Sequence, residues 1–527
     1  MVDGTPSAGA VGDVLLAICD RSHVGDPELI PAVAELLVAQ LDVQLAGVPD
    51  LCSNVASLPD LLDGTSAGRV VFALCDTGPS RAELQLWGRK AALDPFAVES
   101  VDLGLLGRLC PPDRLVEHAA AALAGAVTAA RVAGPTPIDR MRMQLAGDGV
   151  SRRALLSGAP VTYRPVAAID RSTCLGTKRC GLCVDACPVG AILRSQPIPS
   201  VTTDTCVGCA ACVTTCPTDA AGVASATIDE LEARLDAIRA WPWREGPPGV
   251  LYTCRGATRS LSSADDHAVA DGTGWIPLPV PCLSAVTEGW LLQALAGGAP
   301  AVGVLGCGDG CGAGSRERMD ERLAYSRALL AGVGRTDADL VVRSARVDDH
   351  DPLGPLVAPV LARAGVRGPT PANLAEPMAT ATALEELVDG SGVPEVVPGL
   401  GPLGDVAIVA DGCTLCGICA RVCPTAALVL DEGVASVALS LDTGRCVACE
   451  HCVQACPEQV VTVVRRTGPD ALAGRRTVKA ATIGQCRRCG RPVAPTPMLD
   501  RIREMLPDEA PELLDALTGL CMDCRGR

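Results

Sequence analysis

Cysteine is the residue whose number and spacing point most directly to chemistry in this chain. The 527 residues include 28 cysteines, which fall into seven groups of four. The most regular group reads Cys413-Thr-Leu-Cys416-Gly-Ile-Cys419-Ala-Arg-Val-Cys423-Pro, and the same pattern starts again at Cys446. Three thiolates two residues apart can hold one [4Fe–4S] cube, while the fourth cysteine reaches a second cube. The spacing therefore predicts paired cubes, because zinc would need two C-x-x-C pairs per ion.

Two such pairs of motifs occur, and each predicts a two-cluster module of the bacterial ferredoxin type. In the later pair the expected ligand sets are Cys413, Cys416, Cys419 and Cys456 for one cube, and Cys446, Cys449, Cys452 and Cys423 for the other. In the earlier pair they are Cys174, Cys180, Cys183 and Cys216 for one cube, and Cys206, Cys209, Cys212 and Cys187 for the other. Five residues separate Cys174 from Cys180 where two are usual, so a three-cysteine [3Fe–4S] site stays open there.

Three further quartets lie outside these modules. They are Cys19, Cys52, Cys75 and Cys110; Cys254, Cys282, Cys307 and Cys311; and Cys486, Cys489, Cys521 and Cys524. Most members of the first two sets stand at the ends of expected strands, and the carboxyl ends of parallel strands converge on one crevice. Each set could hold one metal centre, although scattered buried thiols remain the alternative for the first. The last set contains two C-x-x-C pairs, for which we expect zinc, with an iron–sulfur centre or free thiols as alternatives.

Alternating strand and helix patterns must position the first two of these quartets. The apolar runs Arg69–Cys75 and Ala301–Cys307 predict buried strands, and helical periodicity follows at Arg81–Leu93 and Arg316–Ala331. Such alternation predicts parallel α/β sheets. Because both domains carry cysteines at successive strand ends, they could be distant relatives. We expect an α/β multidomain protein with two parallel-sheet α/β domains, two α+β ferredoxin modules and a small zinc-ribbon-like C-terminal domain.

Composition shifts suggest where these domains begin and end. Stretches rich in Pro and Gly indicate linkers. The expected division is 1–133 for the first α/β domain, 134–173 for a linker, 174–225 for the first ferredoxin module, 245–368 for the second α/β domain, 369–404 for a linker, 405–465 for the second ferredoxin module, and 466–527 for the tail.

The second α/β domain resembles a known family. The runs Val280-Pro-Cys282-Leu-Ser-Ala, Gly289-Trp-Leu-Leu-Gln-Ala-Leu and Gly303-Val-Leu-Gly-Cys307-Gly-Asp-Gly-Cys311 are similar to the delta (iron–sulfur) subunit of methyl-viologen-reducing hydrogenase. The resemblance implies a [2Fe–2S] cluster on Cys254, Cys282, Cys307 and Cys311. It also implies that this cluster passes electrons to heterodisulfide reductase.

The first α/β domain resembles the N-terminal domain of the A-type subunit of heterodisulfide reductase. The similar runs are Ala17-Ile-Cys19, Pro49-Asp-Leu-Cys52-Ser, Arg69–Cys75 and Leu93–Glu99. This resemblance implies a fifth [4Fe–4S] cluster on Cys19, Cys52, Cys75 and Cys110. No G-x-G-x-x-G follows an expected strand, so the flavin domain of that family is not expected here.

Charge and the N-terminal sequence limit the remaining classes of function. The net charge of −16 argues against nucleic-acid binding. The first residues show no basic region followed by an apolar run, and no apolar run reaches the length of a membrane helix. We therefore expect a cytoplasmic protein without a membrane span, whose thiols bind metal and do not form disulfides. The basic segment 465–503 is either a solvated face or a docking site for an acidic partner.

These features favour a multi-cluster electron-transfer subunit that is not itself catalytic. Its expected partners are flavin-containing or heterodisulfide-reductase-like subunits and a donor of the hydrogenase or formate dehydrogenase type. One alternative is a redox sensor or assembly scaffold. Another is a self-contained oxidoreductase with its substrate site at the N-terminal cluster. His451, which stands between two cluster cysteines, either forms a hydrogen bond to a cluster or is simply exposed.

Overall fold

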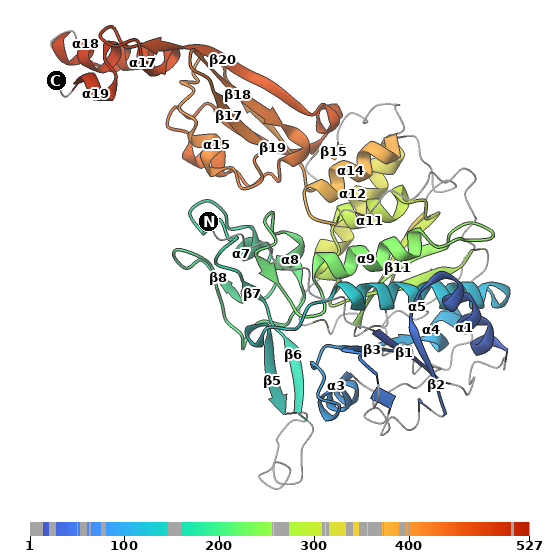
Figure 1. Ribbon diagram of the computed structural model, residues 1–527. Helices are drawn as coiled ribbons and strands as arrows, with labels where there is room; N and C mark the ends of the chain where they lie inside the picture. Colours follow the sequence, from blue (N-terminus) through green and yellow to red (C-terminus); the bar gives the residue numbers. More distant parts are fainter. Residues whose placement is uncertain are drawn as a thin grey trace.

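The structure is a computed structural model in which a parallel sheet, a cysteine-rich module, a second parallel sheet, a second cysteine-rich module and a C-terminal extension follow one another along the chain. It describes residues 14–19, 28–49, 51–52, 61–62, 65–74, 81–145, 161–255, 257, 273–307, 311, 316–333, 341–346, 356, 372, 374–388, 397–398, 401–506 and 511–525. The N-terminal strands lie at one end of the molecule, and the C-terminal helices project at the other (Figure 1).

The first sheet is parallel, with its four strands in the order β2-β1-β3-β4. The strands are β1 (Val14–Cys19), β2 (Gln44–Val48), β3 (Arg69–Leu74) and β4 (Val98–Asp102), and the helices are α1 (Leu29–Gln40), α3 (Arg81–Lys90), α4 (Leu103–Leu109) and α5 (Leu115–Val132). Strand β1 is buried at every position, as a strand covered on both faces requires. The predicted parallel α/β fold is confirmed here.

The second sheet repeats this topology, with the order β12-β11-β13-β14 and all strands parallel. Its strands are β11 (Gly249–Cys254), β12 (Trp275–Val280), β13 (Ala301–Gly306) and β14 (Val341–Arg346), and its helices include α11 (Glu288–Ala296) and α12 (Arg316–Gly332). The register also agrees. Ile18 pairs with Ala73, which stands two residues before Cys75. Thr253 pairs with Leu305, which stands two residues before Cys307.

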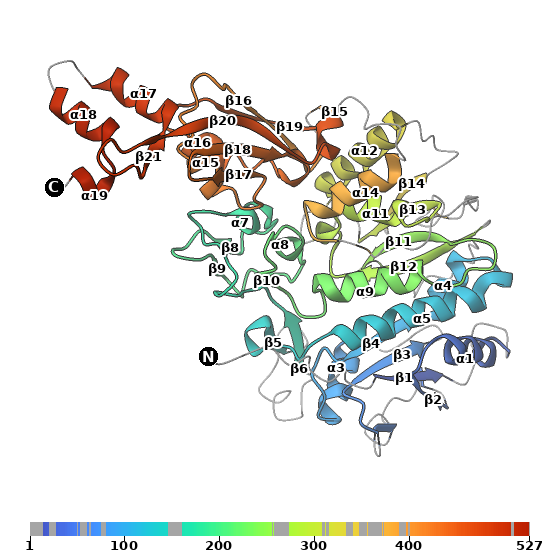
Figure 2. The same cartoon turned by 45° about the horizontal axis from the view of Figure 1, so that its top comes forward.

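Two long helices lie between the sheets. Helix α5 packs along α9 (Ile228–Arg239), and Figure 2 shows both of them sandwiched between the N-terminal strands and β11–β12. His118 of α5 connects the first α/β domain to the second. Its ring nitrogens lie 2.9 Å from the carbonyl oxygens of Arg114, at the start of α5, and of Thr273, just before β12. The stretch Pro112–Val132 is long and apolar enough to cross a membrane, but 72% of its most apolar window is buried. It therefore has the environment of a core helix.

The first cysteine module consists of very short elements. They are β7 (Ala168–Ile169), α7 (Leu182–Ala186), β8 (Ile192–Leu193), β9 (Ser200–Val201), α8 (Ala211–Thr214) and β10 (Ala221–Gly222). The preceding residues 134–173 are not only the linker that their Pro and Gly content suggests. Strands β5 (Met141–Leu145) and β6 (Val161–Pro165) form an antiparallel hairpin there. Met141, Met143 and Leu145 alternate with polar residues, which is the period of a strand.

The second module is larger and is tied to the rest by an unexpected helix. Its elements are β16 (Gly404–Ile408), α15 (Ile418–Val422), β17 (Leu428–Glu432), β18 (Ser436–Asp442), α16 (His451–Ala455) and β19 (Val461–Thr467). Residues 369–404, expected as a linker, contain α14 (Met378–Val388). Ala379, Ala383 and Leu387 recur every four residues and are buried, and the helix packs on α11. Because the helix is rich in alanine and threonine, its sequence resembles that of a linker.

The C-terminal tail extends the second module's sheet. Strand β20 (Arg475–Gln485) pairs with β18, and β21 (Pro492–Pro495) completes the order β17-β18-β20-β21. The helices α17 (Thr496–Met505), α18 (Pro511–Gly519) and α19 (Met522–Arg525) follow. The tail is therefore a long hairpin capped by short helices, and the predicted separate zinc ribbon is not confirmed.

Candidate metal centres

The second module contains two cavities, and each is lined by one of the expected cysteine sets. One cavity, whose space of about 360 Å³ is partly open to solvent, is lined by residues of β16 and β19, and its four thiols are Cys413, Cys416, Cys419 and Cys456. The other, of about 330 Å³ and also partly open to solvent, is lined by Cys423, Cys446, Cys449 and Cys452. Each cavity thus receives three cysteines from one motif and the fourth from the other. This is the crossed arrangement that the spacing indicates.

Left-handed backbone conformations wrap each motif around its cavity. Leu415 and Gly417 have φ angles of +57° and +72°, and Ala448 and Glu450 at the matching positions have +50° and +60°. A non-glycine residue in this region costs about 1–3 kcal/mol, so it persists only where the surroundings impose it. Gly404 is needed for space, because a Cβ there would lie 2.9 Å from the Cys446 sulfur.

The chemistry of this donor set fits a metal centre. Burial, together with the neighbouring Cys413 thiol, raises the pKa of Cys419 to about 11. Burial likewise raises the pKa of Cys446 to about 11 and that of Cys452 to about 12. Four thiolates in one buried cavity repel one another unless cations compensate their charge, and metal binding deprotonates such thiols.

The first module presents the same arrangement, including its irregular motif. A cavity of about 370 Å³ is lined by Cys174, Cys180, Cys183 and Cys216. Despite the long loop, Cys174 is therefore beside the other three thiols. Its sulfur accepts a hydrogen bond from the Gly176 N–H at 3.4 Å. Burial raises the pKa of Cys183 to about 12, and Cys180, Cys216 and Cys174 add to the shift.

The other set of the first module also comes together. It consists of Cys187, Cys206, Cys209 and Cys212. Burial, followed by the neighbouring thiols, raises the pKa of Cys212 well above its ordinary value. Backbone N–H groups point at two of these sulfurs, since Ala167 donates to Cys206 at 3.3 Å and Ala191 donates to Cys187 at 3.2 Å. Such donors stabilise a sulfur that carries negative charge.

The second α/β domain brings its four cysteines into mutual contact. Cys254 ends β11, Cys282 and Cys307 follow β12 and β13, and Cys311 lies close behind. A hydrogen bond with Cys254, and then burial, raise the pKa of Cys282. Burial and a hydrogen bond with Cys311 raise the pKa of Cys307, which also contacts Cys254. The carboxyl ends of the strands therefore deliver one thiol cluster, as the topology predicts.

This thiol cluster adjoins the first ferredoxin module. Cys209 and Ala211 of that module form one apolar group with Cys282, and Cys311 packs against it. The Cys282 thiol is close enough to raise the pKa of Cys209, after burial as the main cause. Two candidate centres from different domains are thus side by side.

The N-terminal quartet is brought together only in part. Cys19 is fully buried at the end of β1, and Cys52 packs against the same apolar core. Cys75 lies outside the described residues. Cys110 follows α4 and lies against the start of β12, where a Cβ on Gly274 would come within 2.8 Å of its Cα. Burial raises the pKa of Cys110 to about 12, and no described cysteine contributes to that shift.

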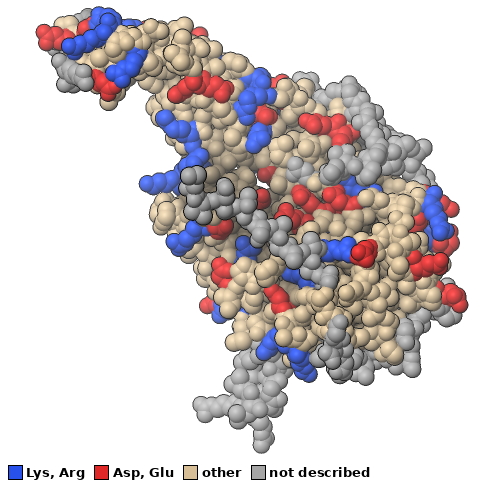
Figure 3. Space-filling model, in the orientation of Figure 1, with Lys and Arg blue, Asp and Glu red and all other residues tan. Residues whose placement is uncertain are grey.

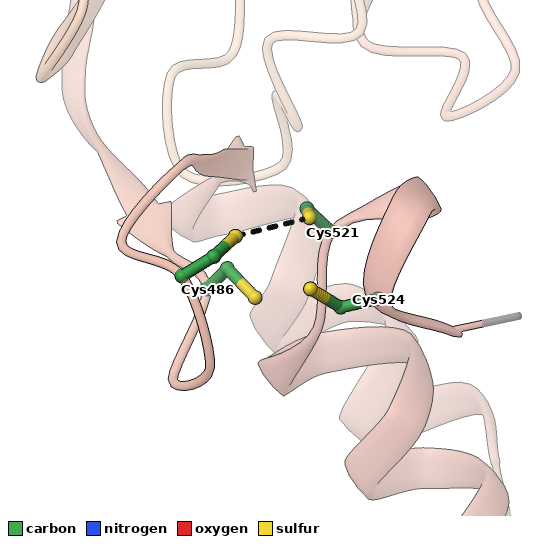
Figure 4. A group of neighbouring side chains, drawn as sticks. Cys486, Cys521 and Cys524 are labelled. Carbon is green, nitrogen blue, oxygen red and sulfur yellow. Dashed lines mark hydrogen bonds between the residues drawn. The ribbon is translucent and has the colours of Figure 1, made fainter. Parts of the chain in front are cut away.

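Among the described residues, the C-terminal quartet forms a close group of thiols. The sulfurs of Cys486, Cys489, Cys521 and Cys524 all lie within 4.8 Å of one another. Figure 4 shows Cys486, Cys521 and Cys524 of this group facing one another. The Cys489 and Cys521 sulfurs are 3.5 Å apart. Backbone hydrogen bonds, first from Cys521, lower the pKa of Cys486 to about 6. A thiolate at neutral pH among three close thiols suits a single tetrahedral cation.

The basic segment 465–503 is largely neutralised by local ion pairs. Arg487 pairs with Asp515, and Arg501 contacts Glu458 at 3.1 Å. Figure 3 shows positive and negative side chains interspersed over this extension. On this face the described residues of the extension carry both charges, and docking onto an acidic partner stays a prediction.

Comparison with known families matches three of these regions to two family models. A family model for the 4Fe-4S dicluster domain matches residues 173–220 and 412–460. A model for the delta subunit of methyl-viologen-reducing hydrogenase matches residues 262–358. A search of curated proteins found no match. The matched ranges leave out residues 11–133, whose resemblance to heterodisulfide reductase stays a prediction. The two dicluster domains and the delta-subunit-like domain support an iron–sulfur electron-transfer subunit.

Proposed function

We propose that the chain is the multi-cluster electron-transfer subunit of a soluble oxidoreductase complex and relays single electrons between redox partners. The observation that carries the proposal is the contact of Cys282 and Cys311 with Cys209 and Ala211. It joins the thiol cluster of the delta-subunit-like domain to a dicluster module. A redox sensor would not require two candidate centres from different domains to adjoin.

The proposed cofactors follow the thiol sets. The two dicluster modules would hold four [4Fe–4S] clusters, and the delta-subunit-like domain one [2Fe–2S] cluster on Cys254, Cys282, Cys307 and Cys311. Cys19 and Cys52 would contribute to a fifth [4Fe–4S] cluster, with Cys75 and Cys110 as the further ligands implied by the sequence. The C-terminal quartet would hold zinc. Iron–sulfur clusters accept and release one electron at a time, with potentials tuned by burial and hydrogen bonds.

The proposed complex is of the heterodisulfide reductase, hydrogenase or formate dehydrogenase type and cytoplasmic. A flavin-containing or heterodisulfide-reductase-like subunit would exchange electron pairs with substrate, and a hydrogenase-type or formate-dehydrogenase-type subunit would supply electrons. The delta-subunit-like domain supports this assignment, because the family it resembles includes hydrogenase subunits. The C-terminal extension, which projects from the body, offers a surface for such a partner (Figure 1).

Metal content is the first test. Anaerobically prepared protein should contain about 22 iron atoms and about one zinc per chain, of which the dicluster modules hold about 16 iron atoms. Elemental analysis with acid-labile sulfide determination measures this. Iron well below about 14 per chain would refute the four cubes, whereas a value near 16 would remove only the clusters of the two α/β domains.

The second test is whether the chain depends on partners. Nicotinamide cofactors deliver a hydride, whereas iron–sulfur centres exchange single electrons, so a flavin-containing partner is needed to couple them. The isolated protein should be reduced by dithionite but only slowly by NADH or NADPH, as followed by absorbance under anaerobic conditions. Stoichiometric flavin in the purified protein, or rapid NADH oxidation by it alone, would favour a self-contained oxidoreductase instead.

A further inference from the structure

The loop between Cys174 and Cys180 is unlike the corresponding loop of the other three motifs. It contains five residues, Leu175 to Arg179, where the others contain two. The cavity beside it is nevertheless lined by both cysteines. The longer loop therefore does not exclude Cys174 from the site. The extra residues require another explanation.

This loop has a defined structure of its own. Thr177 is only 5% exposed, its hydroxyl donates a hydrogen bond to the Ser195 carbonyl oxygen at 2.7 Å, and its N–H donates to the Pro197 carbonyl oxygen at 3.1 Å. Gly176 has φ +79°, and a Cβ there would lie 2.7 Å from the Pro197 oxygen. The base of the loop is thus fixed, and the exposed residues Lys178 and Arg179 are held out from it.

Arg179 reaches the second ferredoxin module. Its Nε donates a hydrogen bond to the carbonyl oxygen of Arg421 at 3.1 Å. Arg421 stands between Cys419 and Cys423, which line different cavities of that module. The Arg421 side chain in turn donates to the Cys416 carbonyl oxygen at 3.2 Å. The contact therefore joins the residue next to Cys180 to the segment between both candidate centres of the second module.

Another side-chain link to the second module lies away from its cysteines. The hydroxyl oxygens of Tyr325 and Thr467 are 2.8 Å apart and buried. Thr467 is the last residue of β19, whose first residue, Val461, lines a cavity. The Tyr325–Thr467 link holds the second module against the second α/β domain. Arg179, in contrast, contacts the second module within its cysteine motif. In both ribbon views the first module lies directly beside the second (Figures 1 and 2).

From these contacts we infer that the inserted loop, through Arg179, is the bridge by which electrons pass between the two ferredoxin modules. The inference rests on the proposed function. One electron leaves the Cys174/Cys180/Cys183/Cys216 site, which is oxidised, and reduces a site of the second module; no atom or proton is transferred. The hydrogen bond replaces a through-space gap in the path between the modules. This matters because the tunnelling rate falls steeply with the through-space distance. Arg179 acts as a positioning residue.

Two variants of the full chain isolate this contact. Arg179→Met removes the hydrogen bond to Arg421. Lys178→Met is the matched control, because it removes one positive charge from the neighbouring exposed position, which has no hydrogen bond to the second module among the described residues. Thr177 anchors the loop in both variants, so iron content and the first module's electron-paramagnetic spectrum should equal those of the unmodified chain. Cys419→Ser and Cys452→Ser variants assign the spectra of the second module.

The measurement is the redistribution of electrons after a pulse of methyl viologen radical that supplies less than one electron per chain. Rapid freezing and paramagnetic resonance then follow a concentration-independent phase between the modules. We expect this phase to slow several-fold in Arg179→Met and to be unchanged in Lys178→Met. An equal rate in both variants and the unmodified chain would overturn the bridge. Absence of the phase in the unmodified chain would instead refute the relay itself.

Discussion

A Cys307→Ser variant is expected to lose the paramagnetic signal of the delta-subunit-like domain. In the unmodified chain, reduction should produce a rhombic signal that persists at liquid-nitrogen temperature. Cys307 contacts both Cys254 and Cys311, so its loss removes the thiol that links the two halves of the site. We expect loss of about two iron atoms per chain. The spectrum of the full chain, recorded after dithionite reduction, measures the effect.

The matched control is the same chemical change in the C-terminal quartet. Cys489→Ser replaces a thiol in another four-cysteine group, which lies in the C-terminal extension. It should leave the persistent rhombic signal intact. If Cys307→Ser gives an unchanged spectrum, or if Cys489→Ser abolishes the signal, the ligand assignment is wrong. Because Cys307 follows β13 directly and is partly exposed, serine should not disturb the strand itself.

Loss of this site should also isolate the first module from the delta-subunit-like domain. Cys282 and Cys311 form the contact with Cys209. In an assembled complex, electrons arriving at the delta-subunit-like domain would then have no centre from which to continue. The proposed relay thus depends on a contact that no motif spacing reveals.

The sequence predicted those parts of the fold whose pattern is local. Strands such as β1 and β11 are buried at every position, so an apolar run alone identifies them. The cysteine spacing likewise predicted which four thiols line each cavity of the second module. Where a few adjacent residues determine a strand or a ligand set, the sequence was sufficient to predict it.

The sequence was less informative where distant segments decide the outcome. Helix α14 is rich in alanine and threonine and is recognisable as core only because α11 covers it. Cys110 was grouped with Cys19 by its place after a strand. The sequence did not show that it lies against the start of β12, and its place in the N-terminal quartet stays a prediction. Arg179 and Arg421 are 242 residues apart, so the length of the loop was visible but its contact was not.

Removing the iron should unfold the first ferredoxin module while both parallel sheets persist. Each of its strands β7, β8, β9 and β10 has two residues, and α7 and α8 have five and four. Isolated elements of this length are not stable in water. The thiols of each set repel one another when charged, so metal binding must supply much of the folding free energy, as it does in other small metal-binding domains.

The second module should respond differently, which gives the experiment an internal control. Its strands β18 and β20 have seven and eleven residues and belong to a four-stranded sheet. After iron is removed with a chelator, peptide-resolved hydrogen exchange should show complete loss of protection over 174–222. Protection should fall only around the cysteine motifs of the second module and should remain in β1, β11, β13 and β18. Retained protection over 174–222 in iron-free protein would show that this module folds without clusters, and the metal could not then be what orders it.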